Sequence, residues 1–171
     1  MTENKLFNQG YNALKNGQDR DISFEFFIQY CVNCLKDLSS RPQWEQEFVK
    51  GFYKYNDTNY LLANKFFINS ISTYEGLDIV VQSTLLTFLG LSYWTIKNET
   101  KALEIFQVIL NIDPDNLFVL CNIISILASF KYEDKYQVDQ LKYYIDKVKK
   151  LDIDKVILKQ YNTYQHASRK N

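Results

Sequence analysis

The chain has few residues that interrupt helices, since only five Gly and two Pro occur among 171 residues. An all-β domain would need a turn signal about every 8–12 residues, so this scarcity disfavours one and predicts long helices joined by short turns. Hydrophobic residues make up 46% of the chain and aromatic residues 16%, which excludes a disordered composition. The sequence therefore predicts an ordered, all-α protein.

The chain also lacks an excess of charge, because 20 basic residues balance 20 acidic ones. It therefore has no overall field to attract nucleic acid or an anionic membrane. The longest apolar stretch, at 118–130, is too short to cross a bilayer. The opening MTENKLFNQGYN has no apolar core and is not rich in Arg, so we expect neither a signal nor a transit peptide. We expect an intracellular, cytoplasmic protein without membrane insertion.

Residues that could support catalysis or bind metal are equally scarce. The one histidine, His166, lies in a polar tail with no orienting partner nearby, and the isolated glycines form no phosphate-binding loop. Cys31 and Cys34 form a CVNC motif, but structural zinc needs four ligands, and Cys121 with His166 makes a poor second pair. We expect reduced, buried thiols. The chain is predicted to be no enzyme, with no metal, cofactor or small-molecule substrate.

An internal repeat is visible in the spacing of small and aromatic residues. Gly90 is followed twelve residues later by Ala102 and four later again by Phe106. Gly51 is followed at the same intervals by Ala63 and Phe67, in a unit that lies 39 residues earlier. Small residues allow two helices to cross closely while an aromatic ring fills the space beside them.

The fuller pattern around the second unit consists of Leu86, Leu89, Gly90, Tyr93, Ala102, Phe106 and Pro114. It resembles the tetratricopeptide repeat, a 34-residue helix-turn-helix. The match is best over 83–116 and looser over 44–75 and 117–152. The resemblance implies one domain over 1–171, a right-handed α-solenoid of antiparallel helix pairs with degenerate helices over 3–38 and a capping helix over 154–166.

Helices are predicted at 3–16, 22–38, 43–56, 58–74, 78–96, 99–112, 116–130, 135–151 and 154–166. Ser23, Asn98 and Asp154 are the predicted N-caps of three of them. Asp113 and Pro114 should end the helix at 99–112, because the residue before a proline is disfavoured in the α region. Asp115 and Asn116 should cap the next helix.

In the tetratricopeptide family the first helix of each repeat lines a concave groove. The resemblance assigns this partner-binding groove to Phe48, Phe52, Tyr55, Thr87, Leu91, Trp94, Cys121 and Ser125. Members that hold carboxylates place Lys, Arg and Asn there, whereas this groove is aromatic and apolar. It should accept a helical or extended apolar segment of a protein partner, with Trp94 and Tyr55 as anchors.

Two alternatives stay open at the level of sequence. The groove aromatics could instead be covered by the terminal helices of the same chain. The chain could also be a permanent structural subunit of a larger assembly rather than an adaptor with an exchangeable partner. A weaker hypothesis is RNA contact through the Lys/Tyr-rich C-terminal helices. The aspartates among these lysines argue against it, and we do not expect nucleic acid as the main partner.

Overall fold

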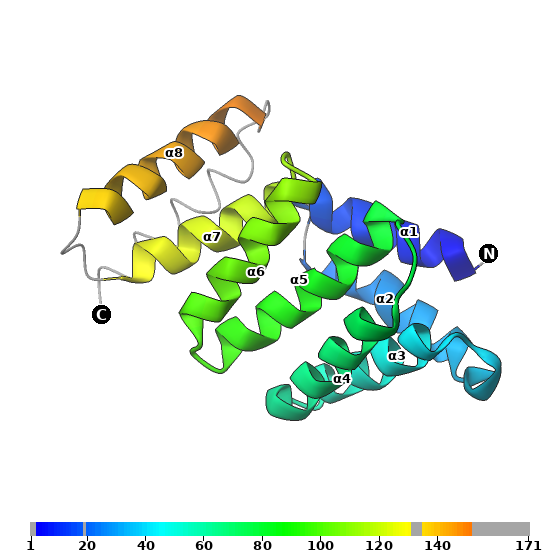
Figure 1. The fold of residues 1–171 in the computed structure, drawn as a ribbon. Helices are drawn as coiled ribbons and strands as arrows, with labels where there is room; N and C mark the ends of the chain where they lie inside the picture. The colour runs from blue at the N-terminus through cyan, green and yellow to red at the C-terminus, as the bar shows by residue number, and fades with distance from the viewer. Residues whose placement is uncertain (1–2, 19, 131–134, 152–171) are drawn as a thin grey trace. The chain divides into compact units, whose positions relative to one another are not determined.

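The computed structural model describes residues 3–18, 20–130 and 135–151, and within these ranges the regular structure is entirely helical (Figure 1). The all-α prediction is thereby confirmed for the described residues. The α-helices are α1 (Glu3–Lys15), α2 (Arg20–Cys34), α3 (Gln43–Asn56), α4 (Tyr60–Thr73), α5 (Ile79–Thr95), α6 (Glu99–Ile112), α7 (Leu117–Ser129) and α8 (Lys135–Leu151), with a short 3-10 helix at Leu38–Ser40. The predicted helix over 154–166 lies outside the described residues.

The chain divides into two compact units, Met1–Val119 and Leu120–Asn171. The first unit holds α1 to α6 and the first turn of α7; the rest of α7 and α8 belong to the second. Within the first unit α1 packs on α2, α3 on α4 and α5 on α6, and α4 also packs along α5. Narrower contacts join α1 to α5, α2 to α3 and α3 to α5. The α1–α2 pair therefore lies against α3 and α5.

The same turn closes all three helix pairs of the first unit. Gly17, Thr58 and Lys97 each have a positive φ, of 66°, 61° and 63°. In each turn this residue donates its N–H to the carbonyl three residues back, and the next residue donates to the carbonyl five back. This pair of hydrogen bonds is the Schellman motif, which ends many helices. Each of the three residues follows a helical glycine by seven positions.

The two helices of each pair also cross in the same way, with a glycine of the first helix against a phenylalanine of the second. A Cβ built on Gly90 would lie 2.6 Å from Cε1 of Phe106, and one built on Gly51 would lie 2.7 Å from Cε1 of Phe67. Gly10 has the same relation to the ring of Phe27, at 2.7 Å. Glycine is therefore favoured at each crossing, because a Cβ there would overlap the ring of the paired helix and force the ring to shift.

The first pair departs from the predicted spacing by one residue. Its helix α2 begins at Arg20, so Ser23 is a buried helical residue and not the N-cap that the sequence suggested. Ser23 takes the place that Ala63 and Ala102 occupy in the other pairs, four residues before the ring at the crossing. One extra residue in the α1–α2 turn shifts this pattern. Two other predicted caps are confirmed, since Asn98 accepts a hydrogen bond from the Lys101 N–H and Asn116 accepts one from the Val119 N–H. The predicted cap Asp154 lies outside the described residues.

Candidate functional site

Six of the eight predicted groove residues lie in the first unit. Phe48, Phe52 and Tyr55 belong to α3, and Thr87, Leu91 and Trp94 belong to α5. All of them except Trp94 are buried, with only 0% of Phe48 and 1% of Phe52 exposed to solvent. Trp94 is partly exposed. The α3 and α5 positions assigned to a groove therefore present little open surface.

Helix α2 covers the aromatic residues of α3. The ring of Phe24 lies 6.0 Å from that of Phe52, and the ring of Phe27 lies 6.3 Å from those of Phe48 and Phe52, between centroids. The sequence left open whether these aromatic residues line an exposed groove or are covered by the terminal helices of the same chain. The burial of Phe48 and Phe52 agrees with such a cover. Their apolar area contributes to folding, at about 1.5–3 kcal/mol for each fully buried ring.

Phe88 of α5 stands at the centre of these rings, which we call the aromatic cluster. Its centroid lies 5.1 Å from Phe27, 5.2 Å from Phe52 and 5.8 Å from Phe67. The ring is fully buried. Phe88 is not among the residues predicted from the sequence, because it falls between the groove positions of the repeat pattern. The remaining members of the cluster are Phe7, Phe24, Tyr30, Phe48 and Tyr55.

Tyr55 places the one polar atom of its ring at the edge of this cluster. Its hydroxyl accepts a hydrogen bond of 2.8 Å from Arg20, whose guanidinium also lies 4.8 Å from the centre of the Phe24 ring. Burial raises the pKa of Tyr55 and outweighs the opposing effect of Arg20. The phenol is therefore neutral and committed to a contact between α2 and α3.

The last two predicted groove residues, Cys121 and Ser125, belong to the second unit and are partly exposed. The Ser125 hydroxyl donates a 2.9 Å hydrogen bond to the Cys121 carbonyl within α7.

The Lys/Tyr-rich helices considered for RNA contact are described only as far as α8. On this helix Tyr136 and Tyr143 are exposed, with Asp139 and Asp146 on the same helix. His166 and the lysines beyond residue 151 lie outside the described residues.

The CVNC motif lies against a buried carboxylate, that of Glu45. Glu45 of α3 accepts hydrogen bonds from the Tyr30 hydroxyl, from Cys34 Sγ at 3.3 Å and from Arg41 at 3.2 Å. Burial and then Glu45 raise the pKa of Cys34 to about 12, and burial raises that of Cys31. Both thiols are free. Within 3–18, 20–130 and 135–151, no cluster of three or more His, Cys, Asp and Glu side chains is arranged to hold a metal ion.

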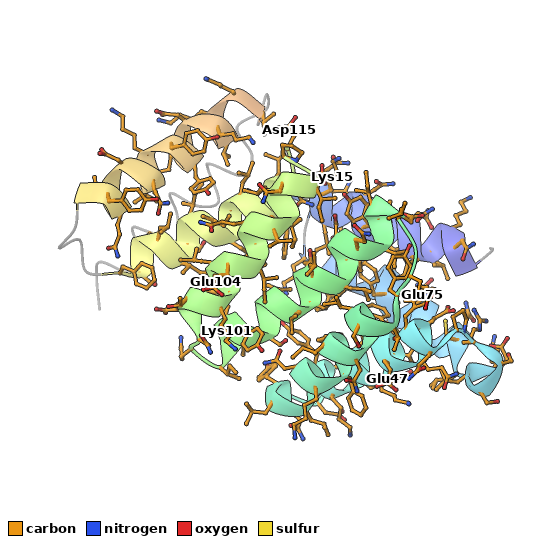
Figure 2. The ribbon with its side chains drawn as sticks, in the orientation of Figure 1. Lys15, Glu47, Glu75, Lys101, Glu104 and Asp115 are labelled. Carbon is orange, nitrogen blue, oxygen red and sulfur yellow. The ribbon has the colours of Figure 1, made fainter. Side chains whose placement is uncertain are left out.

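A second polar cluster ties the start of the first unit to its end. The carboxylate of Asp113 accepts hydrogen bonds from the Tyr11 hydroxyl, from Lys15 Nζ at 2.8 Å and from the Asn116 amide at 3.2 Å. Figure 2 shows Lys15 at the end of α1, near the turn that carries Asp115. Burial alone would raise the pKa of Asp113, but the bonds from Lys15 and Tyr11 outweigh it and lower the pKa. Asp113 thus does more than end α6, because it also holds α1 in place.

No protein-family model, curated protein or solved structure matches this chain. In the part of the chain that is described, no helix has both the length and the apolar character needed to span a bilayer.

Proposed function

We propose that the chain is a non-catalytic protein–protein interaction module, built from tetratricopeptide-like helix pairs that stack as a right-handed α-solenoid. The observation that carries this proposal is the recurrence, in three successive pairs, of one Gly–Phe crossing and one Schellman turn. Units of this kind stack on their neighbours and create extended surfaces, which commonly bind other proteins.

The two polar clusters also favour a non-catalytic role. The groups with shifted pKa values are the first candidates for chemistry in any fold. Here the raised pKa of Cys34 keeps its thiol protonated, which removes the nucleophile. The carboxylates of Glu45 and Asp113 each accept hydrogen bonds that join one helix to another. Both clusters are thereby explained as links within the fold.

The aromatic cluster limits where a partner can bind. Removing α2 would expose the buried Phe27 and Tyr30 at roughly 1.5–3 kcal/mol for each ring, and would uncover more of the half-buried Phe24 and the α3 rings as well. A micromolar partner supplies only about 8 kcal/mol. Binding should therefore leave α2 in place and use surface that is already open. Trp94 is the predicted groove residue of α5 that keeps exposed area, and tryptophan is a frequent interface anchor.

Replacing each of the two tryptophans by alanine tests this assignment. Trp44 is the matched control, because its ring packs on Tyr74 at 5.2 Å and on Phe7 at 6.4 Å. We expect Trp44→Ala to lower the melting midpoint and to keep partner capture in the folded fraction. Trp94→Ala should abolish capture with a smaller change in the midpoint. Equal capture by Trp94→Ala and the unmodified chain would refute the role of Trp94.

A permanent subunit of a larger assembly is the second candidate, favoured by apolar side chains that stay uncovered. Leu77 is 89% exposed in the loop between α4 and α5, and Leu61 of α4 is 68% exposed. A subunit of this kind aggregates when produced alone and becomes soluble when co-produced with its assembly. A chain that stays dispersed by itself would favour the module with an exchangeable partner.

A further inference from the structure

Helix α2 carries apolar residues on its outer side as well as on its buried side. Ile28, Val32 and Leu35 follow one another at intervals of four and three residues, which places them on one face of the helix. They are 41%, 48% and 48% exposed. Leu35 continues the helical turn beyond Cys34, because its N–H bonds to the Cys31 carbonyl. We call these three side chains the α2 stripe.

The two helices of the first pair differ in the residues that they expose. The exposed residues of α1 include Asn4, Lys5, Asn8 and Asn12. Helix α2 instead exposes the α2 stripe beside polar residues such as Glu25 and Gln29. An exposed apolar surface with a polar rim is typical of a site that binds another protein.

One acidic and one basic residue, Glu25 and Lys36, lie beside the α2 stripe on either side of its centre. Glu25 precedes the centre of the stripe and Lys36 follows it, and both are exposed. Lys36 lies in the turn that follows α2, where its N–H bonds to the Asn33 carbonyl and so continues the winding of the helix. The eleven residues between Glu25 and Lys36 amount to about three helical turns, which places both near the same side. Glu25 accepts a hydrogen bond from Gln29, and Lys36 donates one to Asn33.

A two-fold axis across α2 would bring opposite charges together. In a symmetric pair, if residue i of one copy meets residue j of the other, then j also meets i. Two antiparallel copies of α2 centred between Gln29 and Val32 would place Glu25 of each copy opposite Lys36 of the other. Ile28, Val32 and Leu35 of both copies would fill the seam between these two ion pairs.

We propose that the α2 stripe binds a second copy of this chain, with the two α2 helices antiparallel. The contact is small beside the roughly 800 Å² that each partner buries in a standard interface, so the dimer should be weak and form at tens to hundreds of micromolar. This inference does not depend on the identity of any other partner.

Exchanging the two charges tests the geometry of the dimer. Glu25→Lys and Lys36→Glu should each be monomeric at a concentration where the unmodified chain is dimeric, because like charges would meet twice across the axis. A mixture of the two variants should form a heterodimer, since both of its charge pairs are then opposite. Sedimentation velocity with one variant enlarged by a fusion tag distinguishes the heterodimer from either homodimer.

Val32→Glu supplies a control on the seam itself. Val32 is exposed, so the melting midpoint should stay unchanged while the dimer is lost at all accessible concentrations. Three results would each overturn the proposal: a monomeric unmodified chain at several hundred micromolar, a dimer that persists in Val32→Glu, or charge variants that do not complement each other.

Discussion

Gly90→Ala sets two opposing effects against each other at the crossing of α5 and α6. Alanine is the better helix former, by about 1 kcal/mol in a helix interior, so an open site would be stabilised. Here the new Cβ would meet three atoms of the Phe106 ring, at 2.6 Å, 3.0 Å and 3.0 Å. Carbon atoms in contact are normally about 3.5–4.0 Å apart, so the ring has to move by roughly 1 Å.

The ring of Phe106 has no free space to move into, because it is fully buried. Overpacking of this kind costs about 1–3 kcal/mol, which exceeds the gain in helix propensity. We expect a net loss of about 1 kcal/mol and a decrease of about 2–4 °C in the melting midpoint.

Chemical denaturation of Gly90→Ala, Phe106→Leu and the double variant measures the coupling between the two sites. The double variant should be more stable than the sum of the two single losses predicts, because leucine leaves room for the new methyl group. A Gly90→Ala chain that is more stable than the unmodified chain would refute the close crossing.

Two further substitutions test the ties and turns of the first unit. Asp113→Asn should lower stability at pH 7 by about 1–3 kcal/mol, since it removes charged hydrogen bonds. The lowered pKa of Asp113 means that its contribution is present above the ordinary value of 3.8 and is lost as the pH falls below it. The variant should therefore lose less stability between pH 5 and pH 2, and an unchanged pH profile would contradict this. Thr58→Gly should raise stability by about 0.5–1 kcal/mol, and by more than Thr58→Ala does, because Thr58 has a φ of 61°. Thermal denaturation of the two variants checks the order.

The positions of the helices could be predicted because local signals determine them. The bounds of α3, α6 and α8 match the predicted ranges 43–56, 99–112 and 135–151. Asparagine caps and the scarcity of glycine and proline are readable without tertiary contacts. The Gly–Phe crossings of the second and third pairs were also predictable, since glycine and phenylalanine keep one spacing in both. The first pair was not, because one extra residue in its turn displaced the pattern.

Contacts between distant segments could not be read from the sequence. Tyr11 and Asp113 are separated by 102 residues, and nothing in the stretch IDPDN indicates a partner in the first helix. The neighbours of Asp113 in sequence predict only that it ends a helix. The burial of Phe48 and Phe52 could not be predicted from the sequence either, because it depends on where α2 packs. Local patterns determine helices, whereas the choice between groove and core depends on the packing of helices.

The residue types at the groove positions do, however, carry information about their cover. An exposed groove with Phe48, Phe52 and Leu91 would leave a large apolar area in water, and monomeric proteins seldom expose contiguous apolar patches beyond a few hundred Å². Phe24 and Phe27 of α2 supply aromatic surface of the matching kind within the same chain. Phenylalanine at a groove position therefore predicts a cover of some sort. Where a neighbouring helix of the same sequence is also rich in phenylalanine, an internal cover is the simpler expectation, because its ring contacts require no loss of translational freedom.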